Sequence, residues 1–201
     1  MERKSGTDIK KYKIEIPTRI KKSEKINILN QYSKELEKIK PGRKEANKYH
    51  KIIFNILIEI FDERLKTPRM EEYLAKKTQR CDITFRNERE KGFFKQLAEG
   101  YHKICPSIFL ECKNYNEDIG NPEFAQIQNR LNKSRGQFGI IICRKIIDIT
   151  KVEKRQENLI RDDKYILVFD DSDIKKLILW KLDEEEEKID DYLEERFKEL
   201  I

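Results

Sequence analysis

The chain has few of the residues on which several common kinds of active site depend. Its 201 residues include only two histidines, His50 and His102, which lie far apart. This scarcity argues against a zinc site or a histidine-based catalytic triad. The four cysteines lack paired metal-ligand spacing, so we expect reduced thiols in the core. Among its seven glycines there is no phosphate-binding loop of the kind that ATPases use.

Long hydrophobic runs are also missing. No apolar run approaches the roughly 20 residues that a membrane-spanning helix needs, and the lysine-rich N-terminus does not resemble a signal peptide. We therefore expect a cytoplasmic protein without membrane contact. The length favours one domain with an extension, large enough to bury a core.

Charge is abundant and unevenly distributed. Residues 171–201 contain 12 acidic and 6 basic side chains, a net charge of −6. Because the whole chain carries +6, residues 1–170 carry +12. Such a surface attracts polyphosphate partners, although charge runs more often cover solvated faces. The composition thus favours nucleic acid as a partner without establishing it.

The hydrophobic pattern predicts an α/β fold. A helix after Pro41-Gly42 carries an apolar stripe, and a second helix is expected from Asn121 as N-cap with Pro122 in the first turn. Strands are expected at residues 81–85, 108–113, 136–143 and 165–169. Further helices are expected near 93–101, 152–161, 172–181 and 184–201. An edge strand or extended arm at Tyr12 to Ile16 and a helix capped by Ser23 precede them. We divide the chain into an N-terminal arm and helix (1–41), a core (42–182) and a C-terminal amphipathic helix (183–201).

Charged residues inside two of these strands point to chemistry. Asp82 lies in the first, and Glu111 and Lys113 follow the apolar residues of the second. Isolated buried charges cost several kcal/mol each unless they are paired or bind a metal. Residues i and i+2 of a strand share a face, so Glu111 and Lys113 should point into one cleft. Two carboxylates there would attract a hard cation such as Mg²⁺.

An acidic residue on one strand and Glu-X-Lys on the next resembles the signature of the PD-(D/E)XK nuclease superfamily. Here the motif reads Asp82 and Glu111-Cys112-Lys113, with Cys81 in the variable position where a proline can stand. The resemblance covers residues from about 42 to 145. It implies a restriction-endonuclease-like core, with a central mixed β-sheet flanked by helices and extra N- and C-terminal helices.

The same resemblance implies roles for the site residues. Asp82, Glu111 and the Cys112 backbone carbonyl would hold one or two Mg²⁺ ions, for which Mn²⁺ can substitute, and Glu45 would assist. Lys113 would orient the attacking water or stabilise the charge that develops on the phosphate. A glutamine on the helix after Asn121 would hold water or phosphate: Gln126 is the first candidate and Gln128 competes. A solvated helix face remains the alternative for both glutamines, and helix-dipole stabilisation is the alternative for Glu45.

The predicted function is a Mg²⁺-dependent endonuclease that hydrolyses DNA phosphodiester bonds, in restriction or phage defence. A catalytically idle nucleic-acid-binding or assembly module, and a DNA repair or junction-resolving nuclease, are the alternatives. Double-strand cleavage would favour a homodimer, and a defence effector would need an activating partner or ligand. The residues expected to contact the DNA backbone are Arg43, Arg80, Arg86, Asn114 and Arg130.

Overall fold

The computed structural model describes residues 22–74 and 79–201, with backbone alone at 22–23, 72–74 and 79–80. A five-stranded mixed sheet in the order β1-β2-β3-β4-β5 forms its centre. The strands are β1 (Lys66–Leu74), β2 (Gln79–Arg86), β3 (Ser107–Lys113), β4 (Phe138–Cys143) and β5 (Tyr165–Phe169). The three strands β1 to β3 pair antiparallel, whereas β3, β4 and β5 pair parallel. The sheet is therefore mixed, as the sequence predicted, and β3 lies where the pairing changes direction.

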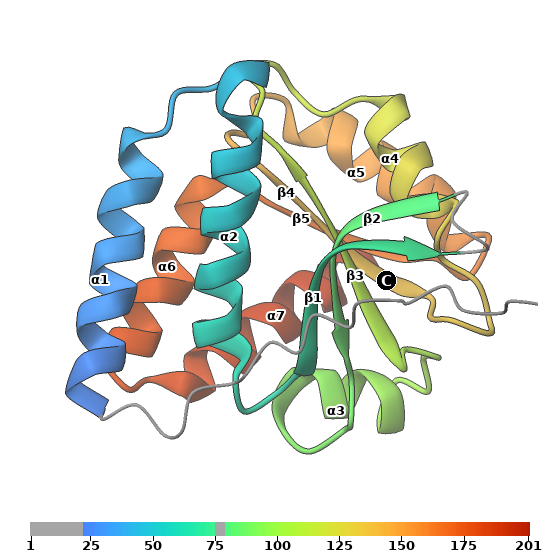
Figure 1. The fold of residues 1–201 in the computed structure, drawn as a ribbon. Helices are drawn as coiled ribbons and strands as arrows, with labels where there is room; N and C mark the ends of the chain where they lie inside the picture. The colour runs from blue at the N-terminus through green and yellow to red at the C-terminus, as the bar shows by residue number, and fades with distance from the viewer. Residues whose placement is uncertain (1–21, 75–78) are drawn as a thin grey trace, which may run out of the picture.

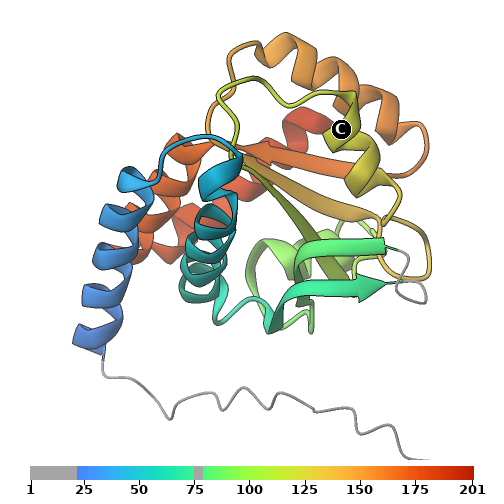
Figure 2. The same cartoon turned by 45° about the horizontal axis from the view of Figure 1, so that its top comes forward.

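Helices cover both faces of the sheet (Figures 1 and 2). In the described part of the chain they are α1 (Lys22–Lys38), the short 3-10 helix η1 (Arg43–Glu45), α2 (Ala46–Phe61), α3 (Gly92–Glu99), α4 (Asn121–Gln128), α5 (Ile149–Ile160), α6 (Asp171–Leu182) and α7 (Glu186–Leu200). Helices α4 and α5 lie on one face. Helices α2, α3, α6 and α7 lie on the other, and α1 packs outside against α2 and α6. None of the described helices is long and apolar enough to cross a membrane.

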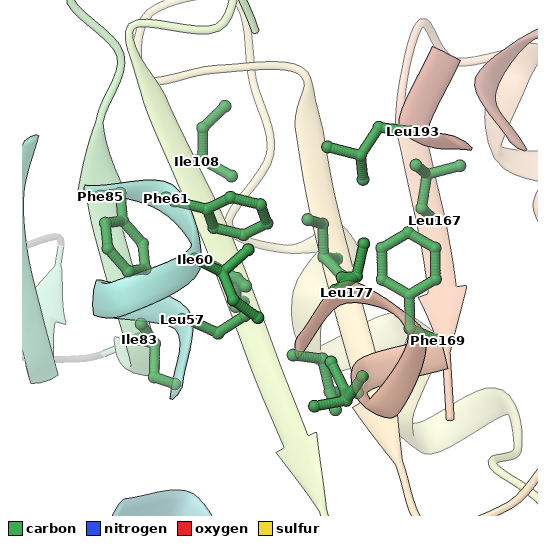
Figure 3. Packing of buried hydrophobic residues seen from close by; sticks show 14 of the residues in the cluster. Leu57, Ile60, Phe61, Ile83, Phe85, Ile108, Leu167, Phe169, Leu177 and Leu193 are labelled. Atoms are coloured by element: carbon green, nitrogen blue, oxygen red, sulfur yellow. The ribbon is translucent and has the colours of Figure 1, made fainter. Parts of the chain in front are cut away.

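The period-two alternation of the parallel strands separates two hydrophobic clusters. Odd and even positions of β5 go to opposite faces: Leu167 joins the cluster under α2, α6 and α7, whereas Val168 joins the cluster under α4 and α5. Figure 3 shows the larger cluster. There Phe61 of α2 lies beside Phe85 and Ile108 of the sheet, and Leu193 of α7 lies toward β5. The larger cluster extends from Leu29 of α1 to Phe197 of α7, so all three predicted segments of the chain share one core.

The prediction for the cysteines is confirmed, two predictions about helix ends are corrected, and one strand was not predicted. All four cysteines are free and buried. The cap of α4 is Gly120 rather than Asn121, because the Glu123 side chain accepts the Gly120 N–H at 2.7 Å. Helix α1 includes Ser23 instead of starting after it. Strand β1 was not predicted at all. The arm at Tyr12 to Ile16 lies outside the described residues.

Candidate active site

Strand β3 carries two of the predicted site residues on its α4 face. Glu111 and Lys113 alternate with Cys112, which points into the larger core cluster with Leu110. Phe109, two positions before Glu111, belongs to the cluster under α4 and α5. Both charged side chains are buried: Glu111 is fully inaccessible and the Lys113 side chain is 10% exposed. The predicted convergence of residues i and i+2 is therefore observed.

Asp82 lies where β2 separates from β3. Pairing between these strands runs from Arg86 opposite Ser107 to Ile83 opposite Leu110, while β2 continues beyond it, paired with β1. Figure 2 shows β1 and β2 running away from β3 there. We call this point the fork. The Asp82 carboxylate fills it, because its Oδ2 accepts the backbone N–H of Cys112 at 3.0 Å. The pairing of β2 with β3 ends before Cys112, and a side chain of β2 accepts this N–H instead.

Glu111 and three side chains around it form one polar cluster. Lys113 Nζ donates to Glu111 Oε1 at 2.9 Å and to Gln126 Oε1 at 2.8 Å. The amide of Gln126 also donates to Glu111 Oε1. Arg130 Nη1 pairs with Glu111 Oε2 at 2.8 Å and donates to the Gln126 carbonyl at 2.7 Å. Because Gln126 and Arg130 are four residues apart near the end of α4, both reach the same carboxylate.

The electrostatics of this cluster keep Lys113 charged. Burial, together with the nearby negative charge of Asp82, raises the pKa of Glu111 from 4.5 to about 7, against the opposing effect of Lys113 and Arg130. Burial by itself would lower the pKa of Lys113, but the charge and hydrogen bond of Glu111 together with the charge of Asp82 outweigh it, and the pKa is raised. A lysine that acts as a general base needs a lowered pKa. In this arrangement Lys113 is a fixed cation, suited to stabilising negative charge.

Three of the predicted residues have other positions than expected. Glu45 does not face the sheet: its carboxylate accepts the backbone N–H of Lys40 at 2.6 Å and Lys48 Nζ at 3.0 Å. It lines a groove between α1 and α2. Arg130 is buried against Glu111, so its guanidinium organises the site rather than presenting a surface for a DNA backbone. The Asn114 amide donates to the carbonyls of Lys40 and Gly42 and so holds the loop before α2.

The remaining predicted residues lie around the molecule. Of the two candidate glutamines, Gln126 is the one whose side chain reaches Glu111 and Lys113. Arg43 is exposed in η1. Arg86 lies four residues from Asp82, near Glu88 at 3.5 Å. The Arg80 side chain is outside the described part of the structure.

Sequence reasoning missed His50. Helix α2 places its Nδ1 atom 3.9 Å from Asp82 Oδ2, and the two side chains are 21% and 10% exposed. A signal was present, because His50 follows Ala46 by four residues and precedes Ile53 by three, along the predicted apolar stripe. A polar ring in the apolar stripe of a helix points toward the packed side of that helix, which for α2 is the side of the sheet.

The carboxylate oxygens of Asp82 and Glu111 could hold a metal ion only if water molecules completed its coordination. Within residues 22–74 and 79–201, no three His, Cys, Asp or Glu side chains gather closely enough to hold an ion by themselves. Mg²⁺, however, is usually bound through one or two carboxylates while it keeps several waters. Asp82 and Glu111 supply two such carboxylates beside the fork. The carboxylate chemistry of these donors suits Mg²⁺, although Glu111 is fully buried and paired with Lys113 and Arg130 in this structure.

No family model, curated protein or solved structure shows a significant match to the chain. A function must accordingly be inferred from the cluster itself.

Proposed function

We propose that this protein is a metal-dependent endonuclease that hydrolyses DNA phosphodiester bonds and is a member of the PD-(D/E)XK superfamily. The observation that carries the proposal is the hydrogen-bonded cluster of Glu111, Lys113 and Gln126. Asp82, on the neighbouring strand, is near enough for its charge to act on Glu111 and Lys113. These residues come from two strands and a helix. Their spacing in the sequence matches the superfamily motif, and the fold brings them together.

The cost of this arrangement supports a functional role. Glu111 is fully buried between the cations of Lys113 and Arg130. Its pKa is nevertheless raised, so these two cations do not fully offset the cost of burying its charged form. A buried ion pair is commonly no more stable than an apolar replacement of the same size. Clusters of this kind with perturbed pKa values are characteristic of functional sites.

Each residue has a defined task in the proposed reaction. Asp82 and Glu111 would hold the metal ion, which when bound supplies Lewis acidity and a more acidic water. Lys113, held as a cation, stabilises the charge that develops on the phosphate oxygens. Gln126 orients a water or a phosphate oxygen through its amide. Arg130 positions both Glu111 and Gln126 and has no direct contact with substrate in this scheme.

The distribution of charge is compatible with a polyanionic substrate. The acidic residues 171–201 form α6 and α7, which pack on the sheet face opposite α4. Glu111 and Lys113 lie on the other face of the sheet, under α4. Binding that depends on such charge weakens steeply as salt rises.

The test is divalent-metal-dependent nicking of supercoiled plasmid by purified protein, compared across single-stranded, four-way-junction and RNA substrates. Asp82→Asn and Lys113→Met are each expected to lower the rate by at least about 100-fold, as removal of transition-state charge stabilisation does. The control is Glu157→Gln, an exposed carboxylate on α5. Melting curves would establish that every variant is folded.

A second candidate function is supported by one observation. Because both oxygens of Glu111 are engaged by Lys113, Gln126 and Arg130, the site is also compatible with a catalytically idle module that binds nucleic acid. That module would bind DNA in a salt-sensitive way and cleave no substrate with Mg²⁺ or Mn²⁺. Wild-type cleavage that persists in both site variants would instead contradict the assignment of the residues.

A further inference from the structure

We propose that Arg130 is an internal counter-ion of Glu111, which competes with a divalent cation for this carboxylate and so keeps the candidate site latent. The proposal concerns the regulation of that site and rests on the proposed function. It starts from a disagreement: the carboxylates have the chemistry of Mg²⁺ ligands, yet the described part of the chain holds no group of three acidic, histidine or cysteine side chains that could bind an ion. A cation of the chain itself, Arg130, contacts Glu111 instead.

The contact between Arg130 and Glu111 is an ion pair rather than a directed hydrogen bond. Arg130 Nη1 lies 2.8 Å from Glu111 Oε2, and the two side chains are 4% and 0% exposed. Among the described residues no hydrogen bond reaches Glu111 Oε2, whereas Oε1 accepts hydrogen bonds from Lys113 and Gln126. A carboxylate oxygen that accepts no hydrogen bond keeps its lone pairs for another cation. Oε2 is thus the atom at which Arg130 and a metal ion would compete.

The charges of the site already balance without a metal ion. Asp82 and Glu111 contribute two negative charges when ionised, and Lys113 and Arg130 contribute two positive charges, so the sum is zero. A divalent cation would raise the sum to +2 at a largely buried position, where uncompensated charge is costly. Without the charge of Arg130, the same ion would meet a net charge of −1. Removal of this one cation therefore lowers the repulsion on an incoming ion and opens an oxygen to it.

Arg130 comes from a connecting segment and not from the sheet. It follows α4, which ends at Gln128, and its side chain reaches Glu111 from the α4 side. Its Nη1 atom also donates to the Gln126 carbonyl at 2.7 Å, a contact within its own turn. Lys113, by contrast, belongs to β3 itself, so its position is set by the strand. Of the two cations beside Glu111, Arg130 is therefore the one that can be displaced without moving the sheet.

The expected size of the effect follows from the general behaviour of carboxylates. A cation within about 4–6 Å lowers the proton affinity of a carboxylate by roughly ten- to a thousandfold. The same repulsion acts on a divalent cation, so loss of the Arg130 charge should tighten metal binding at least about tenfold. If Arg130 served only to position Glu111, its removal would weaken binding by about 10- to 100-fold, as removal of other supporting partners of a metal ligand does. The two roles thus predict changes of opposite sign.

The measurement is Mn²⁺ binding to the untagged, full-length protein, followed by the electron paramagnetic resonance signal of free Mn²⁺. Arg130→Met and Arg130→Gln should each bind at least about tenfold more tightly than wild type. Both are tested because glutamine has polar atoms that can replace part of the lost hydrogen bonding if methionine destabilises the fold. The matched control, Arg161→Met, removes an exposed arginine after α5 and should leave the affinity unchanged. Adding Glu111→Gln to Arg130→Met should abolish the gain.

Melting curves give a second readout, independent of cleavage. Arg130→Met leaves Glu111 buried without this counter-ion, so the melting temperature should fall in EDTA. Millimolar Mn²⁺ should then raise the melting temperature of Arg130→Met more than that of wild type, because a ligand stabilises the folded form in proportion to how tightly it binds. A merely structural role for Arg130 predicts the fall in EDTA without the larger recovery in Mn²⁺.

The outcomes separate this proposal from the function on which it rests. Mn²⁺ affinity that is unchanged or weaker in both Arg130 variants would overturn the proposal, even if wild type cleaves DNA. A gain that persists after Glu111→Gln would also overturn it, because the ion would then bind elsewhere. Tighter, Glu111-dependent binding in variants that cleave no substrate would support the counter-ion role and contradict the nuclease.

Discussion

Replacing Glu111 with glutamine should change how stability depends on pH. The folded protein holds the Glu111 proton more tightly than the unfolded chain does, because burial and Asp82 raise the pKa from 4.5 to about 7. Stability from this group is therefore fully present below pH 4.5 and is lost as the pH rises to about 7. A shift of this size corresponds to about 3 kcal/mol at 1.36 kcal/mol per pKa unit.

The contribution of Glu111 to the pH dependence of stability is isolated by comparing wild type with Glu111→Gln. Urea unfolding of wild type and Glu111→Gln would be measured from pH 4 to pH 8 in EDTA, since a bound ion would alter the titration. Glutamine does not titrate, so the wild-type free energy of unfolding should fall by about 3 kcal/mol relative to the variant across this range. The curve should flatten above the folded pKa.

Glu157→Gln removes an exposed carboxylate from α5 and should give a difference that is nearly independent of pH. If the difference in unfolding free energy between wild type and Glu111→Gln stays constant with pH, burial does not dominate the pKa of Glu111. If the stability of wild type relative to Glu111→Gln rises with pH, the attraction of Lys113 and Arg130 for the charged carboxylate exceeds the cost of burying it.

Three further predictions concern the fold. Arg64 is 1% exposed and donates from Nε and Nη2 to Asp190 at 2.8 Å each, so Arg64→Ala should lower the free energy of unfolding by about 3–5 kcal/mol in urea titrations; a loss below 1 kcal/mol would contradict this. Gly136 has φ of +146°, and a Cβ there would lie 2.6 Å from the Ser107 carbonyl oxygen, so Gly136→Ala should cost more than about 1 kcal/mol by the same measurement. An unchanged urea midpoint would show that the backbone can relax. Phe197 is fully buried, and Phe197→Ala should cost about 3–5 kcal/mol and lower the melting temperature, whereas an unchanged melting curve would refute the packing role.

Local pattern was sufficient for much of the secondary structure. Strand β5 was predicted with the bounds that it has, and α2 was predicted from its apolar stripe. Strand β1 was missed because its sequence, KTPRMEEYL, has little alternation and contains a proline. Its strand conformation comes from pairing with β2, which is a contact between segments.

For the candidate site, too, some features follow from spacing in the sequence and others do not. Glu111 and Lys113 share a face because a strand has a period of two, and this could be deduced from their spacing. The direction of Glu45 could not be deduced, since the helical stripe did not reveal that Lys40 and Lys48 would bind its carboxylate. Nor did spacing reveal that Arg130 would be buried against Glu111.

The α/β class and the strand that carries Glu111 and Lys113 could be predicted without the structure. These follow from periodicity and residue type, which act over a few neighbouring residues. The separation of β2 from β3 at Asp82 and the approach of His50 on α2 to within 3.9 Å of Asp82 depend instead on tertiary packing. Such contacts join residues distant in the chain, and the packing of helices against the sheet selects them.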